Sequence, residues 1–352
     1  MWLYDKLVKT FRVTEILDKL TTITIKDVAQ HAGVAISTVS RVLNGLDRVS
    51  EKTRVKVSKS AEELGYVRNS LAASMKTGAS QLIAVIVPDL VNEYFAAVIQ
   101  GVEKAAISRG YFTIVFSSND QKNKERELFE GALGRIIDGA IIIPSHVDMD
   151  YYKNLNMPVI IVDRYIPFSE MEAVVVNNFK GAYLLTEALI EAGHKDIAIL
   201  IGPQTFNVGQ ERLAGFEKAM EKHGISVQKQ YVQPSTWYAE SGYDNTKKLL
   251  SMNKPPTAIF ATNNLLCVGA MRAIAQRGLK ISMDISLVGF DDSVLAEFSY
   301  PGITVVKRAT VDMGRIGFEM LIERLDKTDI NGHRFVTLDV EIIHRGSIKK
   351  LM

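Results

Sequence analysis

The 352-residue sequence contains a single cysteine, Cys267, so the chain cannot form an internal disulfide bond. Disulfides are common in secreted proteins and rare in the cytoplasm. No apolar run approaches the ~20 residues that a membrane-spanning helix needs. Residues 1–21 carry scattered charges and no small-residue cleavage site, unlike a secretory signal. These absences predict a cytoplasmic protein and count against a secreted or membrane-bound one.

The sequence also lacks the short motifs of common nucleotide- and metal-dependent enzymes. It contains no G-x-G-x-x-G, no Walker loop and no H-E-x-x-H. Cys267 has no evident base beside it in the sequence, and the histidines lack the spacing of metal ligands. We therefore expect no enzymatic activity, no cofactor and no metal site. The six histidines are His31, His146, His194, His223, His333 and His344.

The composition is that of an ordinary globular protein, with 47% hydrophobic and 23% charged residues. A chain of this length exceeds one typical core, so two or three compact units are expected. The net charge of +2 hides an asymmetry: residues 22–80 carry +4, whereas residues 81–352 carry −3. A small basic unit joined to a mildly acidic one suits a nucleic-acid binder that carries a sensor. An ordinary solvated surface would give the same charges.

Residues 22–54 have the pattern of a helix, a glycine-centred turn and a second helix. Apolar residues recur at helical spacing in both halves, and Gly33 permits the tight turn between them. Burial of the apolar face of the second helix leaves Ile36, Ser37 and Arg41 pointing outward. A helix face of this kind fits the major groove of DNA.

A bare helix-turn-helix pattern is weak evidence, but here many further positions agree at fixed spacing. The segment resembles the headpiece of the lactose-repressor (LacI/GalR) family of bacterial transcription regulators. The family string is roughly T-I-x-D-V-A-x-x-A-G-V-S-x-x-T-V-S-R-V-L-N, then V-S-x-x-T-R and L-G-Y-x-P-N-x-x-A. The matching residues here are 24–29, 32–34, 38–44, 49–50, 53–54 and 64–66, and the resemblance continues to about Gly346.

The resemblance implies a sequence-specific DNA-binding regulator, expected to repress a carbohydrate-utilisation operon. Such a protein binds a palindromic double-stranded DNA operator as a homodimer. A small sugar-like effector in a cleft controls its affinity, and both induction and co-repression occur within the family. The C-terminus has no heptad tail that would build a tetramer. The alternative is a sugar-binding transport-type protein without DNA activity, which leaves the basic headpiece and the missing signal unexplained.

The expected fold class is an all-α helix-turn-helix headpiece followed by an α/β, two-lobed, periplasmic-binding-protein-like effector domain. The domains are an unassigned extension (1–21), the headpiece (22–67), a hinge helix (68–80), the effector domain (81–346) and a tail (347–352). Lobe one covers about 81–177 and 308–340, and lobe two covers about 178–307. Predicted strands lie at 82–87, 112–116, 140–143, 159–162, 197–201, 258–261 and 285–288. Predicted helices lie at 94–109, 124–137, 180–192, 210–223, 241–251 and 265–276.

The resemblance assigns DNA contacts to the headpiece and the hinge. Arg41 suits guanine, Ile36 suits a thymine methyl, and Met75 takes the place of the leucine that the family wedges into the minor groove. Ala35 replaces a serine of the family, which weakens the expected helix start. Arg68 and Ala73 also depart from the family's hinge. The assigned contacts are Thr24, Ala35, Ile36, Ser37, Thr38, Ser40, Arg41, Asn44, Ser50, Thr53, Tyr66, Asn69, Ala72, Met75 and Lys76.

Candidate effector-binding side chains lie in loops that follow the predicted strands. Arg212, in the family's R-x-x-G-F, suits pairing with ligand hydroxyls or an acid, and Trp237 suits stacking on a sugar ring. Asp291 lies where the family holds ligand hydroxyls or amines. Helix capping is an equal alternative for Asp89. A purely structural role is an equal alternative for Trp237. The candidates are Asp89, Asn92, Tyr94, Phe95, Ser145, Asp163, Phe206, Arg212, Trp237, Asn263 and Asp291.

Two positions lose a carboxylate relative to the family. Asn177 replaces the aspartate that begins the family's D-N-x-x-G motif. Asn264 replaces the aspartate that ends its N-D motif. If either faces the cleft, the effector is neutral or anionic, since a carboxylate would repel an acidic ligand. A tolerated exchange away from the ligand is the alternative. Calorimetric titration with neutral, acidic and cationic sugars tests the hypothesis, which fails if only a cation binds.

The headpiece assignment predicts different consequences for two basic residues. Arg41→Ala should abolish sequence preference, because a bidentate arginine–guanine contact provides about 1–3 kcal/mol of discrimination. Lys52→Ala should weaken all DNA binding equally and lower the salt dependence, because it removes only a phosphate contact. DNA footprinting of both variants measures their affinity and their sequence preference. An unchanged sequence preference in Arg41→Ala would remove Arg41 from base recognition.

Overall fold

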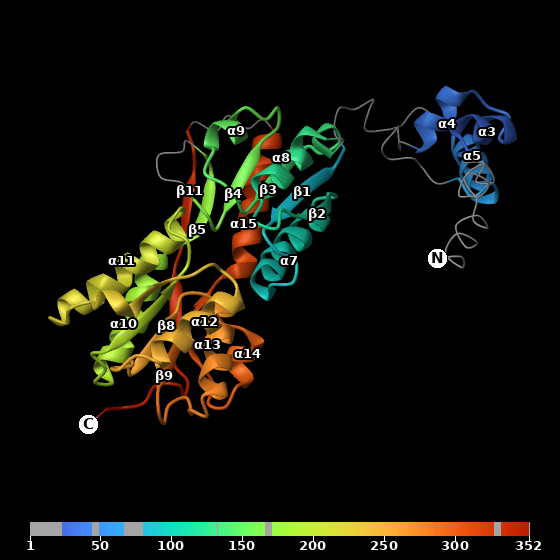
Figure 1. The fold of residues 1–352 in the computed structure, drawn as a ribbon. Coiled ribbons are helices and arrows are strands. Elements are labelled where there is room, and N and C mark those ends of the chain that lie inside the picture. The colour runs from blue at the N-terminus through green and yellow to red at the C-terminus, as the bar shows by residue number, and fades with distance from the viewer. Residues whose placement is uncertain are drawn as a thin grey trace, which may run out of the picture. The chain divides into compact units, whose positions relative to one another are not determined.

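The computed structural model describes residues 23–43, 49–66, 80–131, 133–165, 171–326 and 332–351 (Figure 1). Contacts divide the chain into two compact units, residues 1–78 and 79–352. The extension and the hinge helix predicted from sequence lie outside the described residues. So do the predicted DNA contacts Asn44, Asn69, Ala72, Met75 and Lys76. Within the described ranges, every helix is too short or too polar to cross a bilayer.

The smaller unit contains α3 (Ile25–His31), α4 (Ile36–Leu43) and α5 (Glu51–Glu63). The backbone N–H of Thr24 donates to Asp27 Oδ2 at 2.7 Å, which fixes the first turn of α3. Gly33 adopts φ +57° in the turn before α4, a conformation that glycine tolerates best. The core between the three helices consists of Val28, Ala29, Ala32, Val39, Val42, Val57 and Ala61.

Two six-stranded sheets form the larger unit. The first contains β1 (Leu82–Val87), β2 (Phe112–Ser117), β3 (Gly139–Ile142), β4 (Val159–Val162), β5 (Ala173–Val176) and β11 (Phe335–Leu338), in the order β11-β5-β4-β3-β1-β2. The second contains β6 (Ile197–Ile201), β7 (Val232–Pro234), β8 (Ala258–Ala261), β9 (Ser286–Phe290), β10 (Thr304–Arg308) and β12 (Val340–Ile343), in the order β12-β10-β9-β8-β6-β7. All pairs are parallel except β10 with β12.

Helices cover both faces of each sheet, as the alternation of strands and helices predicts. The first sheet packs α7 (Glu93–Ser108) and α15 (Thr310–Leu325) on one face, and α8 (Lys122–Glu130) and α9 (Met149–Lys153) on the other. The second sheet packs α10 (Asn178–Glu191) and α11 (Asn207–Lys222) on one face. Its other face carries α12 (Ala239–Leu250) and α13 (Asn264–Gln276), and α14 (Val294–Phe298) follows β9.

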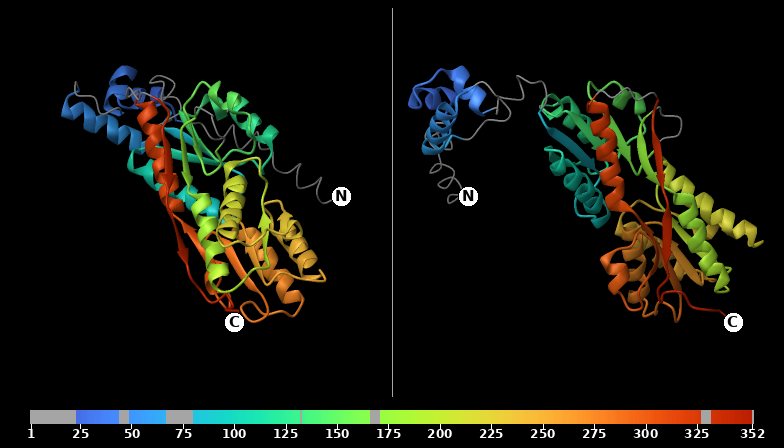
Figure 2. Two further views of the ribbon diagram at one scale, coloured as in Figure 1. Left: turned by 90° about the vertical axis from the view of Figure 1, so that its left-hand side faces the viewer. Right: turned by 180° about the vertical axis from the view of Figure 1, so that it is seen from behind.

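The chain crosses three times between the lobes built on these sheets: after β5, after β10, and between β11 and β12. Figure 2 shows the red C-terminal segment running along both lobes. The predicted return segment of about 308–340 corresponds to the stretch between the last residue of β10 and the first residue of β12. Arg308 ends β10 and Val340 begins β12, and these two residues are paired within the second sheet.

The predicted helix 124–137 is wrong in its extent. The helix ends at Glu130, and a short 3-10 turn occupies Leu133–Arg135. Gly134 packs against the backbone of Phe129 so closely that a Cβ would overlap its carbonyl group. The chain therefore turns here instead of continuing as a helix. Strands β5, β7, β10, β11 and β12 and helices α9, α14 and α15 were not predicted as separate elements.

Because α7 packs closely against α15, one added methyl group at their contact should strongly lower the stability of the protein. A Cβ on Gly314 would overlap the carbonyl oxygen of Val98, and a Cβ on Gly101 would overlap that of Val311. Gly314→Ala should lower the free energy of unfolding by about 1–3 kcal/mol, because the added Cβ can be accommodated only if the two helix backbones separate. Thermal unfolding measures the loss. Lys104→Ala, at an exposed position of α7, is the control, and equal stability of both variants would contradict the prediction.

Candidate DNA-binding face and ligand cleft

The second helix of the headpiece presents the face predicted for DNA. Val39 and Val42 are buried in the core, while Ile36 is 46% exposed and Ser37 and Arg41 are also exposed. The structure thus separates an apolar inner face from an outer face with hydroxyl, aliphatic and guanidinium groups. These are the groups that contact base edges in the major groove.

Further predicted contacts lie at helix starts of the headpiece. Ser50 precedes α5, and its Oγ accepts a hydrogen bond from the backbone N–H of Thr53 at 3.4 Å. The exposed first turn of this helix leaves N–H groups that suit a phosphate. Of the other predicted contacts in the headpiece, Thr24 and Ala35 are exposed and Thr38, Ser40 and Tyr66 are half-buried.

The larger unit contains a cleft between its lobes, lined by side chains from both of them. The cleft lies at the carboxyl ends of parallel strands, where open α/β folds bind ligands. Most side chains predicted from sequence to bind an effector come together here. They are Asp89, Asn92, Tyr94, Phe95, Asp163, Arg212, Trp237, Asn263 and Asp291.

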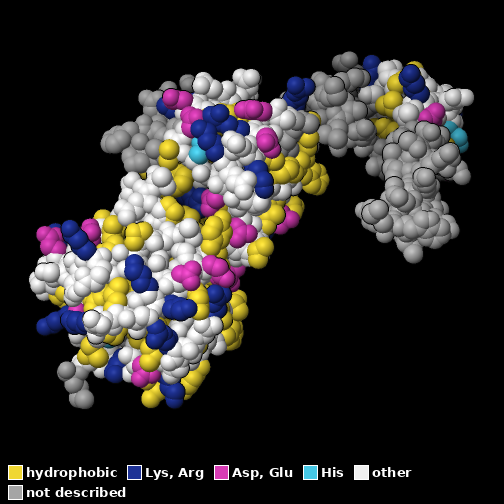
Figure 3. Space-filling model, in the orientation of Figure 1, with side chains coloured by type: hydrophobic (Ala, Val, Ile, Leu, Met, Phe, Trp, Pro, Cys, Tyr) yellow, Lys and Arg dark blue, Asp and Glu magenta, His cyan; other side chains and the backbone are white. Residues whose placement is uncertain are grey.

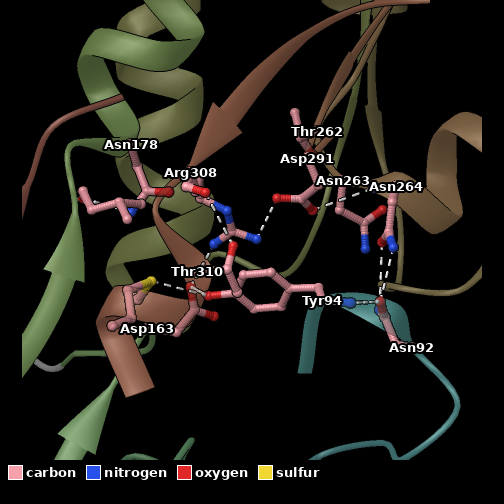
Figure 4. Close-up of polar contacts among 12 residues, drawn as sticks. Asn92, Tyr94, Asp163, Asn178, Thr262, Asn263, Asn264, Asp291, Arg308 and Thr310 are labelled. Atoms are coloured by element: carbon pink, nitrogen blue, oxygen red, sulfur yellow. Dashed lines mark hydrogen bonds and ion pairs between the residues drawn. The ribbon is translucent and has the colours of Figure 1, made fainter. Parts of the chain in front are cut away.

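A buried ionic cluster occupies the centre of the cleft (Figure 4). Arg308, at the end of β10, places Nη1 2.7 Å from Oδ1 of Asp163, which follows β4 of lobe one. Its Nη2 pairs with Asp291, which follows β9 of lobe two. Burial alone would lower the pKa of Arg308, but the neighbouring carboxylates raise it above its ordinary value. Arg308 therefore remains charged and links the two lobes.

Tyr94 completes this cluster from α7. Its ring lies against the Arg308 guanidinium, with 3.6 Å from the guanidinium carbon to the ring centroid. The Tyr94 hydroxyl donates to Asp163 Oδ1 at 2.7 Å. Burial, together with the Asp163 carboxylate, raises the pKa of Tyr94 well above its ordinary value. The neutral hydroxyl is thus a fixed hydrogen-bond donor, and the ring provides a cation–π surface.

Arg212 reaches the same cleft from α11. Its Nε donates to Asn178 Oδ1 at 2.9 Å, its Nη1 donates to the Thr262 carbonyl, and its guanidinium carbon lies 3.7 Å from the Phe290 ring centroid. The side chain is buried, and Nη2 has no hydrogen-bond partner among the described residues. Burial, reinforced by the nearby charge of Arg308, lowers the pKa of Arg212 to about 10. Arg212 therefore remains a cation, and its Nη2 is a hydrogen-bond donor without a partner among the described residues.

Asparagine pairs add direct contacts between the lobes. Asn92, at the start of α7, accepts a hydrogen bond from Asn264 Nδ2 at 2.8 Å. Beside it, Glu93 accepts the backbone N–H of Val294 at 3.3 Å. Of the two positions that lose a carboxylate relative to the family, Asn264 faces the cleft. The other, Asn177, caps α10 by accepting the N–H of Lys180.

Trp237 forms an aromatic wall of the cleft. Gly202, which follows β6, packs directly under the indole, and a Cβ there would overlap its six-membered ring. The Trp237 carbonyl accepts a hydrogen bond from Asn263 Nδ2 at 2.9 Å, while Asn263 Oδ1 caps α13. Asn263 therefore holds the wall in place as well as lining the cleft.

Two predicted effector-binding residues lie outside the cleft lining. Ser145 donates from its backbone N and its Oγ to the buried Glu125 carboxylate, so its polar atoms belong to a separate network within lobe one. Phe206 is buried before α11 and contacts the Arg164 guanidinium. Asp89 lines the cleft and accepts the N–H of Val91 in the turn before α7, but the side chain that caps α7 is Asn92, which accepts the N–H of Tyr94.

Comparison with known proteins identifies both parts of the chain. Residues 24–69 match the model of bacterial regulatory proteins of the lacI family, and residues 186–348 match a periplasmic binding protein-like domain. The regulator RegA of Clostridium saccharobutylicum is 33% identical over 327 residues, covering 92% of this chain and 98% of RegA. The repressor CytR of Escherichia coli K12 is 32% identical over 336 residues, covering 94% and 98%. The chain belongs to the LacI family.

Solved structures of LacI-family proteins have the same fold. The lac repressor dimer bound to operator and the anti-inducer ONPF aligns with a TM-score of 0.82 at 28% identity, covering 94% of this chain and 100% of that one. The complex of the regulator CelR with cellobiose gives 0.71 at 28% identity, covering 92% and 99%. The predicted family and fold class are confirmed, and so is the expectation of a DNA-binding transcriptional regulator and not an enzyme.

The principal cleft residue that sequence analysis missed is Arg308. It lies at the end of an apolar strand whose neighbouring lysine, Lys307, is exposed, so nothing local distinguishes the two cations. Arg164 and Asp120 were also missed as lining residues, and they form an ion pair with each other at the cleft. The signal available was indirect: a charged residue that ends a parallel strand lies at the ligand-binding edge of the sheet.

The packing of Trp237 on Gly202 predicts a measurable effect of a single methyl group. Gly202→Ala should displace the indole, shift its fluorescence emission and lower stability by about 1–3 kcal/mol, because the added Cβ overlaps the ring. A Trp2→Phe background leaves Trp237 as the only tryptophan. Gln204→Ala, at an exposed position nearby, is the control. Unchanged emission and melting temperature in Gly202→Ala would contradict this packing.

Proposed function

We propose that this LacI-family regulator is a homodimeric repressor of a carbohydrate-utilisation operon. It binds a palindromic operator through its headpiece in the cytoplasm, and a sugar-like effector in the interlobe cleft controls its affinity. The outward face of α4, with Ile36, Ser37 and Arg41, is the observation that supports operator binding. The relative bound to operator supports the same proposal. A transport-type protein would have no use for this face.

The cleft supports a small polar effector with an apolar face. Trp237 and Phe95 offer aromatic surfaces, while Arg212 and Asp291 offer hydrogen-bonding groups. Sugars combine an apolar ring face with a rim of hydroxyls, so they complement such a lining. The CelR complex with cellobiose provides a precedent in a structural relative.

An apolar surface on the larger unit supports a dimer. Val294 and Phe298 of α14 are 64% and 78% exposed, and Tyr300 beyond it is fully exposed. Leu90 and Val91, before α7, are exposed in the other lobe. In Figure 3 hydrophobic side chains gather over α7 and α14. A patch shared by both lobes is suited to a two-fold interface, in which each subunit uses the same surface.

The operator itself provides the direct test. Gel shifts at low ionic strength should show retention of a palindromic duplex and weaker retention of a scrambled one. An effector in a sugar library should then change the dissociation constant for the operator by the five- to 150-fold that corresponds to a coupling energy of about 1–3 kcal/mol. A protein that ignores every duplex, with or without metabolites, would not be an operator-binding repressor.

The dimer proposal predicts that Phe298→Glu separates the subunits, because two charges would be buried at a two-fold contact. Light scattering should give the mass of a monomer, and operator affinity should fall at least tenfold because one headpiece cannot contact both half-sites. Met283→Glu is the matched control: it is an exposed apolar residue at the opposite end of β9. A Phe298→Glu variant that remains dimeric excludes α14 from the interface.

A further inference from the structure

We propose that Arg308 is a tethered cation that sets the charge class of effector the cleft accepts and links the lobes before any effector binds. The inference rests on the proposed role of the cleft as the effector site. Arg308 emerges from β10 of lobe two at the point where the chain crosses to lobe one. It therefore acts as a positioning and specificity-determining residue at the junction of the lobes.

Backbone geometry fixes the two carboxylates that Arg308 joins. Asp163 adopts φ +66° and Asp291 adopts φ +77°, conformations that non-glycine residues rarely occupy. Both side chains are buried. Without Arg308, two buried carboxylates from opposite lobes would face the same space and repel each other. Removal of one partner from a buried ion pair is costly for this reason.

Arg308 neutralises the two carboxylates at the centre of the cleft, which would otherwise attract a cationic ligand. Asp163 and Asp291 are both engaged by its two Nη atoms. The groups left without hydrogen-bond partners, among the residues described, include two donors, Nε of Arg308 and Nη2 of Arg212, and one acceptor, Oδ1 of Asp291, which forms an ion pair with Nη2 of Arg308. Both guanidinium groups contact the ring of Phe290, at 5.7 Å and 3.7 Å, so these donors share one buried region.

The effector that complements this arrangement brings oxygen or nitrogen acceptors and no positive charge. Buried N–H groups without partners destabilise a protein, so a ligand acceptor placed between the two guanidiniums would gain both donors. An ammonium group would instead meet two cations. The structure thus provides a physical basis for an effector that is neutral or anionic.

The same cation contributes to closure of the cleft. The Arg308–Asp163 contact joins the second sheet to the first, and Asn264 with Asn92 makes a second, uncharged contact beside it. A charged pair with fixed geometry at 2.7 Å is stronger than an amide pair. Loss of Arg308 should therefore open the lobes even though the asparagine pair remains.

Chemical rescue tests this role with the full-length protein and without knowledge of the effector. Arg308→Ala should increase the radius of gyration in small-angle scattering and lower the melting temperature by on the order of 10 °C. Low-millimolar methylguanidinium chloride should reverse both changes, because the free cation fills the space between Asp163 and Asp291. An equal concentration of sodium chloride should not. Wild-type protein should not respond to either salt.

Two further variants keep the test decisive. Arg315→Ala removes an exposed arginine of α15 that pairs with Asp312 and Glu319, and it should leave the radius of gyration unchanged. If Arg308→Ala does not fold, Arg308→Ala/Asp163→Asn removes the repulsion as well as the cation. This double variant should fold with open lobes and respond less to methylguanidinium. Lobes that stay closed in either variant that lacks Arg308, or an absence of rescue in folded Arg308→Ala, would overturn the proposal.

The outcomes separate this inference from the proposed function. If methylguanidinium recloses Arg308→Ala but no metabolite alters operator retention, the tethered cation stands and effector control fails. If metabolites control operator retention equally in wild type and Arg308→Ala, effector control stands and the tethered cation fails. Preference of wild-type protein for cationic over neutral or acidic sugars would also contradict the charge class assigned to the cleft.

Discussion

The ion cluster of Asp163, Arg308 and Asp291 is the constraint on which the arrangement of the two lobes depends. Each sheet ends in a buried carboxylate, and one guanidinium forms ion pairs with both. Such a cluster tolerates no partial disruption, because any single loss leaves an unpaired buried charge. It also fixes Tyr94, whose ring and hydroxyl contact the cation and one carboxylate. The aromatic and polar lining of the cleft is therefore organised around a charge that the protein itself supplies.

In the proposed function, the effector would alter the arrangement of the lobes through a small number of contacts. Between the lobes, the contacts of the described residues include the arginine bridge, the Asn92–Asn264 pair, the contact of Glu93 with Val294 and the hydrogen bond from the Tyr165 N–H to Asn207. Coupling energies between sites are typically about 1–3 kcal/mol, which is comparable to one or two hydrogen bonds. A ligand that exchanges one of these contacts for its own thus has enough free energy to alter operator affinity in a LacI-family regulator.

Sequence patterns located the elements whose stability is local or whose burial is complete. The bounds predicted for β1, β4, β6 and β8 agree with the structure, since fully buried parallel strands are continuous runs of branched apolar residues. The patterns missed β11, in which exposed and half-buried residues alternate at a sheet edge. They also extended the helix after β2 beyond Glu130, because helical periodicity does not record the close approach of Gly134 to Phe129.

The sequence by itself determined the family, the helix-turn-helix headpiece and the loops from which cleft side chains come, since each of these depends on residues close together in the chain. Only the tertiary structure decided which of those side chains meet. Arg308 contacts Asp163 across 145 residues, while Ser145 turns away to Glu125. The physical reason is that a charged group adopts the position in which its burial is compensated, and its partners come from strands brought together only when both sheets have formed.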